Sequence, residues 1–307
     1  MPQLLPASPE NIQRARDHLL SGGLVAFPTE TVYGVGALAT YKEAIMRIYS
    51  LKNRPTNKFL GLHAGDPKDV WPYVVKTSSA QLLADAFWPG PLTLVLKRCP
   101  GTALERTMVF KDETLAIRVV HHPVATALTK ELGAPFVATS ANSSGCLSST
   151  IAMDVMTAFS QDKDLLVLDG GKTPSGIEST IIDLTNDKVR VLRYGAISCE
   201  EIAACLDVTL TRFERKTALK AQSYSLRLNA ERPFPEEAFL AFGPVKEELS
   251  CVALLNLSPS GDLKEASRNL FPMLRQLKDS GACSIAVMPI PLHDLGAAIN
   301  ERLMKYQ

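Results

Sequence analysis

The chain has 307 residues, of which 46% are hydrophobic, with 18 glycines and 20 prolines, and this is typical of a globular chain long enough for one large domain or two. Its 33 basic and 32 acidic residues leave a net charge of +1, so no global basic field indicates a nucleic-acid binder, and any contact with RNA depends on a local patch. Because the N-terminus lacks a signal-peptide pattern and no run approaches the roughly 20 apolar residues that span a bilayer, we expect a soluble, cytoplasmic protein with no membrane partner.

Helical and strand patterns alternate through the first two thirds of the chain. We predict a capped amphipathic helix over Ser8–Ser21, a buried strand over Leu24–Phe27 and a second helix over Lys42–Ser50. Two further strands are predicted at Leu92–Leu96 and Leu115–Val119. This order predicts an α/β layer structure.

A charged segment that ends in two prolines, Thr211–Pro235, suits a linker better than a core. Beyond it, alternating patterns predict a smaller second α/β domain. Its predicted elements are a strand at Val252–Leu257, a helix at Asp262–Lys278, a strand at Ser284–Met288 and a helix at Leu295–Lys305. We therefore divide the chain into a first domain (1–210), a linker (211–235) and a second domain (236–307).

The segment SGGLVAFPTETVYGVG, Ser21–Gly36, joins an apolar strand to a polar turn. Its threonines offer hydroxyl groups at a strand end, and Gly34 and Gly36 let the backbone approach a ligand closely. An ordinary strand and turn has the same composition, so this segment alone leaves both interpretations open.

Two basic side chains, Lys52 and Arg54, stand two residues apart just after the second predicted helix, and His63 follows the apolar run 59–62. Such a pair can clamp a phosphate or a carboxylate, with Lys as a point charge and Arg as a bidentate fork. Basic pairs on loops are more often only solvated, so this cluster is weak by itself.

Small polar side chains, TSANSSG at Thr139–Gly145, directly follow the strand-like run Pro135–Ala138. They suit phosphate and ribose oxygens, and an Asx or Ser turn is the alternative. Arg118, on or beside a predicted strand, needs a partner if it is buried, and an anionic substrate or an internal salt bridge would serve equally well. His121 and His122 are interpreted as loop residues rather than metal ligands.

The last cluster is GGKTPSG, followed by Glu178, Ser179 and Thr180 and then by the segment RYG at 193–195. Its GKT resembles the end of a P-loop, but the first glycine of that motif would fall on Leu166, and Pro174 lies where its helix should begin. We therefore exclude a P-loop. The six cysteines form no CxxC pair, which argues against a zinc site or a disulfide framework.

Taken in order, the segments FPTETVYG, KxR, LAIRVV, TSANSSG, GGKTPSGIEST and VLRYGAI resemble the threonylcarbamoyl-AMP synthase family, also called the YrdC/Sua5 family. The resemblance covers about Leu19–Ile197. The tail segments NLSPSGDLKEASRNLFPMLRQL and LGAAINERL are similar to the C-terminal domain of the long Sua5 form. The resemblance implies a YrdC-like twisted open α/β sheet domain followed by a smaller Rossmann-like α/β domain.

The resemblance also implies an activity, that of an L-threonylcarbamoyladenylate synthase. Such a nucleotidyltransferase joins L-threonine, bicarbonate and ATP and releases pyrophosphate, with Mg²⁺ bound mainly by the phosphates of ATP and by water. A carbamate formed on the threonine amine attacks the α-phosphorus of ATP, and the protein positions the substrates and neutralises charge. A separate threonylcarbamoyl transferase complex then uses the product for the t6A modification of tRNA, which puts tRNA among the partners to consider.

By the same resemblance, the family's functional residues fall on defined positions of this chain. The carbamate and phosphate centre comprises Lys52, Arg54, Ser140 and Asn142. L-threonine is held by Thr31, His63, Arg118 and Ser179, with Arg118 as the partner of its carboxylate. ATP is contacted by Arg54, Thr114, Ser140, Ser148, Arg193 and Tyr224. No protein ligand of a metal ion is expected.

The chain departs from the family pattern in two places. Asn53 replaces a glycine, and Lys58 stands where the family has an asparagine that contacts ATP, so that Lys58 or Asn57 would have to take that role. The lid segment between the domains is also changed, and we expect altered lid closure with Tyr224 still reaching the site.

Two other classes stay open. One is a catalytically weakened tRNA or double-stranded RNA-binding module of the same fold, which the changed lid favours and the retained KxR and SxN residues disfavour. The other is a carbamoyl-transfer enzyme of hydrogenase maturation or antibiotic biosynthesis. Such enzymes carry additional large domains with metal motifs, and this sequence has none of them.

Overall fold

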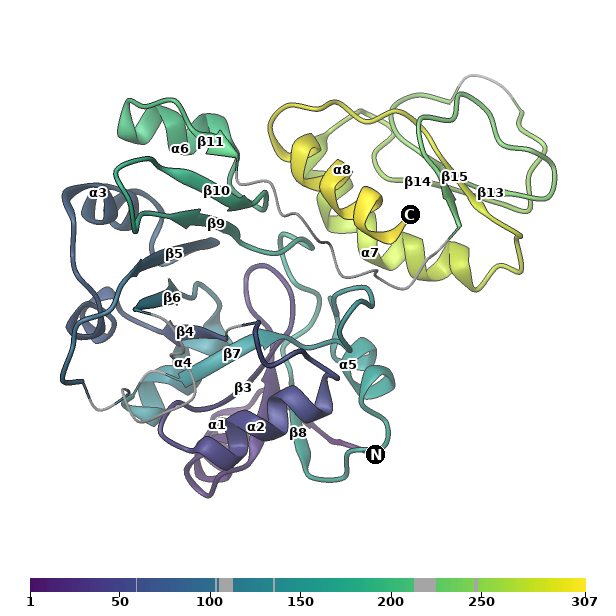
Figure 1. Cartoon of the computed structure of the whole chain (residues 1–307). Helices are drawn as coiled ribbons and strands as arrows, with labels where there is room; N and C mark the ends of the chain where they lie inside the picture. Colours follow the sequence, from purple (N-terminus) through teal and green to yellow (C-terminus); the bar gives the residue numbers. More distant parts are fainter. Residues whose placement is uncertain (59, 103, 105–112, 135, 213–224, 246–247) are drawn as a thin grey trace.

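The computed structural model describes residues 1–307 except 59, 103, 105–112, 135, 213–224 and 246–247. Its strands form an 11-stranded sheet in the first part of the chain and a 4-stranded sheet in the second, each with helices packed against it (Figure 1). The mixed α/β class expected from the sequence is therefore confirmed.

The predicted elements of the first domain are confirmed to within two residues at each end. They are α1 (Pro9–Leu20), β2 (Leu24–Phe27), α2 (Lys42–Leu51), β5 (Leu92–Lys97), β6 (Thr114–Val119) and β7 (Phe136–Ser140). Local chemistry explains the start of α1, because the Ser8 hydroxyl accepts a hydrogen bond from the Asn11 amide at 3.3 Å and Pro9 occupies the first helical turn.

Further elements complete the large sheet and its cover. The strands are β1 (Gln3–Pro6), β3 (Gly34–Leu38), β4 (Gly61–Ala64), β8 (Leu165–Asp169), β9 (Thr180–Asp183), β10 (Arg190–Arg193) and β11 (Thr211–Arg212). The helices are η1 (Pro67–Asp69), η2 (Trp71–Tyr73), α3 (Ser78–Phe87), α4 (Pro123–Leu132), α5 (Ala152–Ala158) and α6 (Cys199–Leu206). The strand order is β1-β8-β2-β3-β7-β4-β6-β5-β9-β10-β11, with parallel and antiparallel pairs mixed.

The two faces of the large sheet are covered differently. On one face α1 and α4 form a core with β2, β7 and β8, which includes Phe27 and Phe136. On the other face, α2, α3, α5 and α6 build a larger core that extends to β5, β6 and β9. On the face of α1 and α4, the central strands β4, β6 and β5 therefore carry polar side chains rather than a helix-covered core.

The second sheet is wholly parallel, with the order β12-β15-β13-β14. Its elements are β12 (Leu226–Arg227), β13 (Ala238–Ala241), β14 (Ala253–Asn256), α7 (Leu263–Lys278), β15 (Ile285–Val287) and α8 (Leu295–Tyr306). The four predicted elements of this domain are present. Two parts of the predicted linker are short strands, because β11 at residues 211–212 pairs with β10 and β12 at residues 226–227 pairs with β15.

The two domains share one apolar cluster. Val32, Leu147 and Ile177 of the first domain pack with side chains of α7 and α8, and both helices lie on the side of the second sheet that faces the first domain (Figure 1). Gly176 permits this approach, since its φ is +69° and a Cβ atom there would lie 2.5 Å from the Cα of Arg268 on α7.

We predict that Gly176→Ala lowers the free energy of unfolding by about 3 kcal/mol, because it combines left-handed backbone strain with a clash against α7. Gly171→Ala is the matched control in the same loop, since its φ is +81° but no atom lies within 4 Å of the added Cβ. Strain alone predicts a loss of about 1 kcal/mol there. Urea unfolding measures both variants, and equal losses would contradict the role of Gly176 in domain packing.

Candidate active site

A row of polar side chains crosses the uncovered part of the large sheet. His63 on β4 is the register partner of Arg118 on β6, and Thr93 follows on the neighbouring strand β5. Thr93 is paired with Ile181 of β9, which is in turn paired with Arg193 of β10. Strand register therefore aligns side chains that lie more than a hundred residues apart in the sequence.

Arg118 is buried in this row with 5% of its surface exposed. Its guanidinium forms an ion pair with Glu30 at 2.7 Å and donates a hydrogen bond to the Thr31 hydroxyl at 2.8 Å. Of the two partners that the sequence left open, the structure shows the internal salt bridge. Although burial alone raises the pKa of a carboxyl group, the charge of Arg118 holds the pKa of Glu30 below its usual value.

Arg118 nevertheless retains hydrogen-bonding capacity for a ligand. Its Nε atom is buried and has no hydrogen-bond partner among the described residues. A buried donor without a partner is unfavourable by about 1–3 kcal/mol, and a carboxylate placed beside it would satisfy that donor. Sequence patterns did not identify Glu30 as the partner of Arg118. Its only sequence signal was its place in the FPTETVYG segment.

His63 is held as a neutral imidazole. Burial, and next the charge of Arg118, lowers the pKa of His63 to about 4. Its Nδ1 lies 3.0 Å from the carbonyl oxygen of Gly61, which can only accept, so Nδ1 donates and Nε2 is left as an acceptor. The ring stacks on Phe136 with centroids 6.1 Å apart.

Ser179 and Arg193 are in direct contact at the other end of the row. Arg193 donates from Nη2 to the Ser179 hydroxyl at 2.8 Å and from Nε to its carbonyl oxygen at 2.9 Å, and the hydroxyl groups of Ser179 and Thr93 lie 2.8 Å apart. Burial lowers the pKa of Arg193 to about 10, so it remains charged at neutral pH. A Cβ at Gly195 would lie 2.3 Å from the carbonyl carbon of Ser179, which explains the glycine of the RYG segment.

Lys52 connects α2 to the end of β7. It is 1% exposed, and its ammonium group donates to the carbonyl oxygens of Ser140 and Asn142. In return the Ser144 amide donates to the Lys52 carbonyl at 2.8 Å. Burial, and next the charge of Arg54, lowers the pKa of Lys52 well below its usual value. The structure thus brings Lys52 together with both residues of the SxN segment.

The loop after Lys52 explains one departure from the family pattern. Asn53 has φ +48°, in the left-handed region that glycine adopts freely and that asparagine tolerates better than most residues. The loop is closed because the carbonyl oxygen of Lys58 accepts from Arg54 Nε at 3.1 Å and from the Tyr49 hydroxyl at 2.9 Å. Asparagine can therefore take the place of the glycine without a different turn.

The other predicted ATP contacts lie in different places. Thr114 begins β6, and strand register places it level with Ser140, because His63 pairs with both Arg118 and Phe136, and Thr114 and Ser140 lie four residues from these partners in the same spatial direction. Ser148 is 1% exposed, and its hydroxyl donates to Glu178 at 2.6 Å. Glu178 in turn pairs with Arg302 of the second domain. Tyr224 lies outside the described residues.

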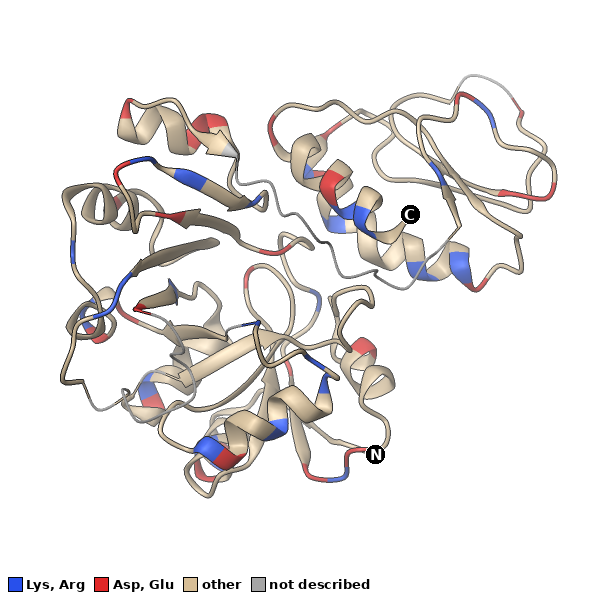
Figure 2. Cartoon of the chain, viewed as in Figure 1, with Lys and Arg blue, Asp and Glu red and all other residues tan. Residues whose placement is uncertain are grey.

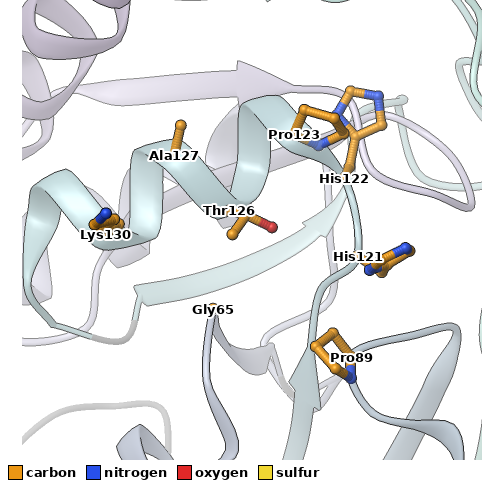
Figure 3. Close-up of a pocket in the computed structure, with 8 residues that line it drawn as sticks. All are labelled: Gly65, Pro89, His121, His122, Pro123, Thr126, Ala127 and Lys130. Atoms are coloured by element: carbon orange, nitrogen blue, oxygen red, sulfur yellow. The ribbon is translucent and has the colours of Figure 1, made fainter.

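The pocket drawn in Figure 3, of about 420 Å³, lies elsewhere, between α4 and the residues that follow β4 and β6. None of the predicted site residues lines it. His121 and His122 do, and His122 also caps α4, because its Nδ1 accepts from the Val124 amide at 3.2 Å. Throughout the described part of the chain, no group of three or more His, Cys, Asp or Glu side chains is arranged to hold a metal ion.

Comparison with known proteins identifies relatives along the whole chain. Residues 17–195 match the family model described as Telomere recombination, and residues 197–305 match that of the threonylcarbamoyl-AMP synthase C-terminal domain. A threonylcarbamoyl-AMP synthase of Pyrococcus abyssi is 32% identical over 320 residues, covering 96% of this chain and 93% of the relative. One of Bacillus subtilis is 39% identical over 204 residues, covering 66% of this chain and 58% of the relative.

Solved structures agree with these relatives. A variant of P. abyssi Sua5 matches with a TM-score of 0.88 and 28% identity, covering 100% of this chain and 96% of the other. The P. abyssi Sua5 complex with L-threonine matches with a TM-score of 0.83 and the same identity and coverage. Escherichia coli YciO matches with a TM-score of 0.57 and 26% identity, covering 64% of this chain and 96% of the other. Among the described residues, no helix is both long enough and apolar enough to cross a bilayer.

We predict that the neutral state of His63 makes the protein sensitive to acid. Its folded-state pKa of about 4 lies below the ordinary value of 6.5, so between these pH values the unfolded chain binds more protons, and stability falls as the pH falls, by up to about 1.4 kcal/mol per pH unit. Urea unfolding at pH 7, 5.5 and 4.5 measures this loss. The His63→Gln variant should lose less stability than the original protein as the pH falls, because it has no imidazole to protonate. If the difference in unfolding free energy between the two proteins does not change with pH, His63 does not have the lowered pKa.

Proposed function

Because the chain belongs to the threonylcarbamoyl-AMP synthase family, in its long Sua5 form, we propose that it is an L-threonylcarbamoyladenylate synthase. The reaction would be a nucleotidyl transfer in which L-threonine, bicarbonate and ATP give threonylcarbamoyl-AMP, pyrophosphate and water. The observation that carries the proposal is the contact of Lys52 with Ser140 and Asn142 at the end of β7, the strand that pairs with β4, which carries His63.

L-threonine would bind over the row on the large sheet. Its carboxylate would accept from Arg118, whose buried Nε has no partner, and charge-assisted hydrogen bonds of this kind are roughly twice as strong as neutral ones. The Nε2 acceptor of neutral His63 can receive a proton donor of the substrate, either its hydroxyl or its amino group. Two hydroxyl groups would complete this subsite. They are those of Thr31, which accepts from Arg118, and of Ser179, which accepts from Arg193.

The carbamate formed on the threonine amine would attack the α-phosphorus of ATP, with pyrophosphate as the leaving group. This step develops negative charge on phosphate oxygens, and fixed cations stabilise it best where water is excluded. Lys52, Arg54 and Arg193 supply such cations. Because Lys52 is held by two carbonyl oxygens, its ammonium position is set before the substrates bind.

Mg²⁺ would enter with ATP, held by phosphate oxygens and water, where it neutralises charge on the phosphates. The cationic side chains of the site suit a metal bound through the nucleotide rather than through the protein. The product would pass to a separate threonylcarbamoyl transferase complex for the t6A modification, which places tRNA downstream of this reaction.

We predict that the purified protein forms threonylcarbamoyl-AMP, detected by mass, together with pyrophosphate, and that both require L-threonine and bicarbonate. Lys52→Met should lower kcat/KM by at least about 100-fold, since it removes a fixed charge at the phosphate centre. Lys42→Met, at the exposed first residue of α2, the helix that precedes Lys52, is the matched control and should retain activity. If Lys52→Met does not fold, Arg54→Gln tests the same centre.

The contradicting result is equally specific. ATP or tRNA binding without product, and with salt-sensitive tRNA affinity, would favour the RNA-binding module of the same fold over the enzyme.

We also predict that the reaction depends on Mg²⁺. Addition of EDTA in excess should abolish pyrophosphate release, because the charge on the triphosphate is then not neutralised, and excess Mg²⁺ should restore the rate. The chelator should leave the thermal unfolding temperature of the ligand-free protein unchanged. Undiminished turnover in EDTA would overturn the role given to the metal.

A further inference from the structure

The last turns of α8, in the second domain, lie against the centre described above. Arg302 donates from Nε to Glu178 at 2.7 Å, and the Tyr306 hydroxyl donates to the carbonyl oxygen of Cys146 at 3.0 Å. Both acceptors belong to first-domain loops that carry predicted site residues. The second domain therefore contacts these loops through the end of α8, and it also does so through Arg275 of α7, which donates to the carbonyl oxygen of Ser148.

A short chain of contacts leads from that helix end to Lys52. The carbonyl oxygen of Cys146, which accepts from Tyr306, also accepts from the Asn142 side-chain amide at 2.7 Å. The carbonyl oxygen of Asn142 in turn accepts from the Lys52 ammonium group. Only Cys146 and Asn142 thus lie between Tyr306 and Lys52 in this chain of contacts.

Lys305 occupies the same helix end, between Arg302 and Tyr306. Its side chain is exposed to solvent, and its Nζ lies 3.3 Å from the Tyr306 hydroxyl and 4.8 Å from the centre of that ring. No carboxylate of the described residues lies within ion-pair distance of it. Figure 2 shows basic and acidic segments next to each other on α8.

Three cations and one carboxylate act on the charge of Lys305. Partial loss of water lowers the pKa of Lys305. The charge of Glu178 opposes this shift, and the charges of Arg302, Arg193 and Lys58 add to it. Glu178 is already engaged by Arg302 and by the Ser148 hydroxyl. Like charges gathered in one place disfavour each other unless an anion binds among them.

We propose that Lys305 is an ATP-binding residue supplied by the second domain, and that its ammonium group contacts an oxygen of the triphosphate beyond the α-phosphate. This rests on the proposed function, in which ATP is the nucleotide substrate. The polyanion would bridge Lys305 and the Lys52–Arg54 pair, so that substrate binding joins the two domains. The contact is absent for AMP, which ends at the α-phosphate.

Titration calorimetry of the full chain with ATP, AMP and L-threonine tests this assignment. Lys305→Ala should weaken ATP binding about tenfold, the size expected for one charge-assisted contact, and should leave AMP and L-threonine within twofold of the original protein. Lys305→Arg, which keeps the charge, should recover most of the ATP affinity. Lys264→Ala removes an exposed lysine from α7 in the same domain and should change none of the three affinities.

Unchanged ATP affinity in Lys305→Ala would overturn the assignment, as would an equal loss for all three ligands, which indicates a structural effect. The same samples, assayed for threonylcarbamoyl-AMP, separate this inference from the proposed function. If the original protein binds ATP but forms no product, the proposed function is wrong, and the calorimetric comparison still tests whether Lys305 binds ATP. Absence of ATP binding in the original protein removes both.

Discussion

The buried ammonium group of Lys52 is the constraint on which the site depends. A cation removed from water is unfavourable unless polar groups replace its hydration, and here the carbonyl oxygens of Ser140 and Asn142 do so. Those carbonyls are available only where β7 ends and the chain turns, so the end of α2 must lie against the end of β7. The lowered pKa of Lys52 records the cost of this arrangement, and a bound polyanion would offset it.

The contact between the domains also depends on buried charges whose hydrogen-bonding capacity is satisfied by protein groups. Glu178 and Arg302 are buried as a pair, and a buried pair stabilises only when its remaining hydrogen-bonding capacity is also satisfied. Glu178 accepts from the Ser148 hydroxyl, while Arg302 also donates to the Tyr194 carbonyl at 2.9 Å and to Glu301 at 2.8 Å. Although burial alone raises the pKa of a carboxyl group, Arg302 holds that of Glu178 well below its usual value. A network of this kind fixes one relative placement of the two domains, with α8 beside the site.

Local pattern predicted only part of the elements: α2 was predicted although it has no side-chain cap, whereas the capped helix α6 and the apolar strand β8 were not predicted. Strand β2 has four consecutive buried residues, whereas β3 is GVGAL, whose glycines give a weak strand pattern. Helix α4 was missed because its N-cap is His122, an uncommon capping residue. Family resemblance located Lys52 and Arg118, but only strand register could show which residues share a row. Neither pattern nor spacing could show that Glu30 pairs with Arg118, or that α8 reaches the site.

The most direct measurement is a crystal structure of the chain with L-threonine and a non-hydrolysable ATP analogue. The account predicts the threonine carboxylate beside Arg118 over the row on the large sheet, its amino group towards the α-phosphate, and that phosphate beside Lys52 and Arg54. The nucleotide in the pocket next to α4, or threonine away from Arg118, would contradict the account.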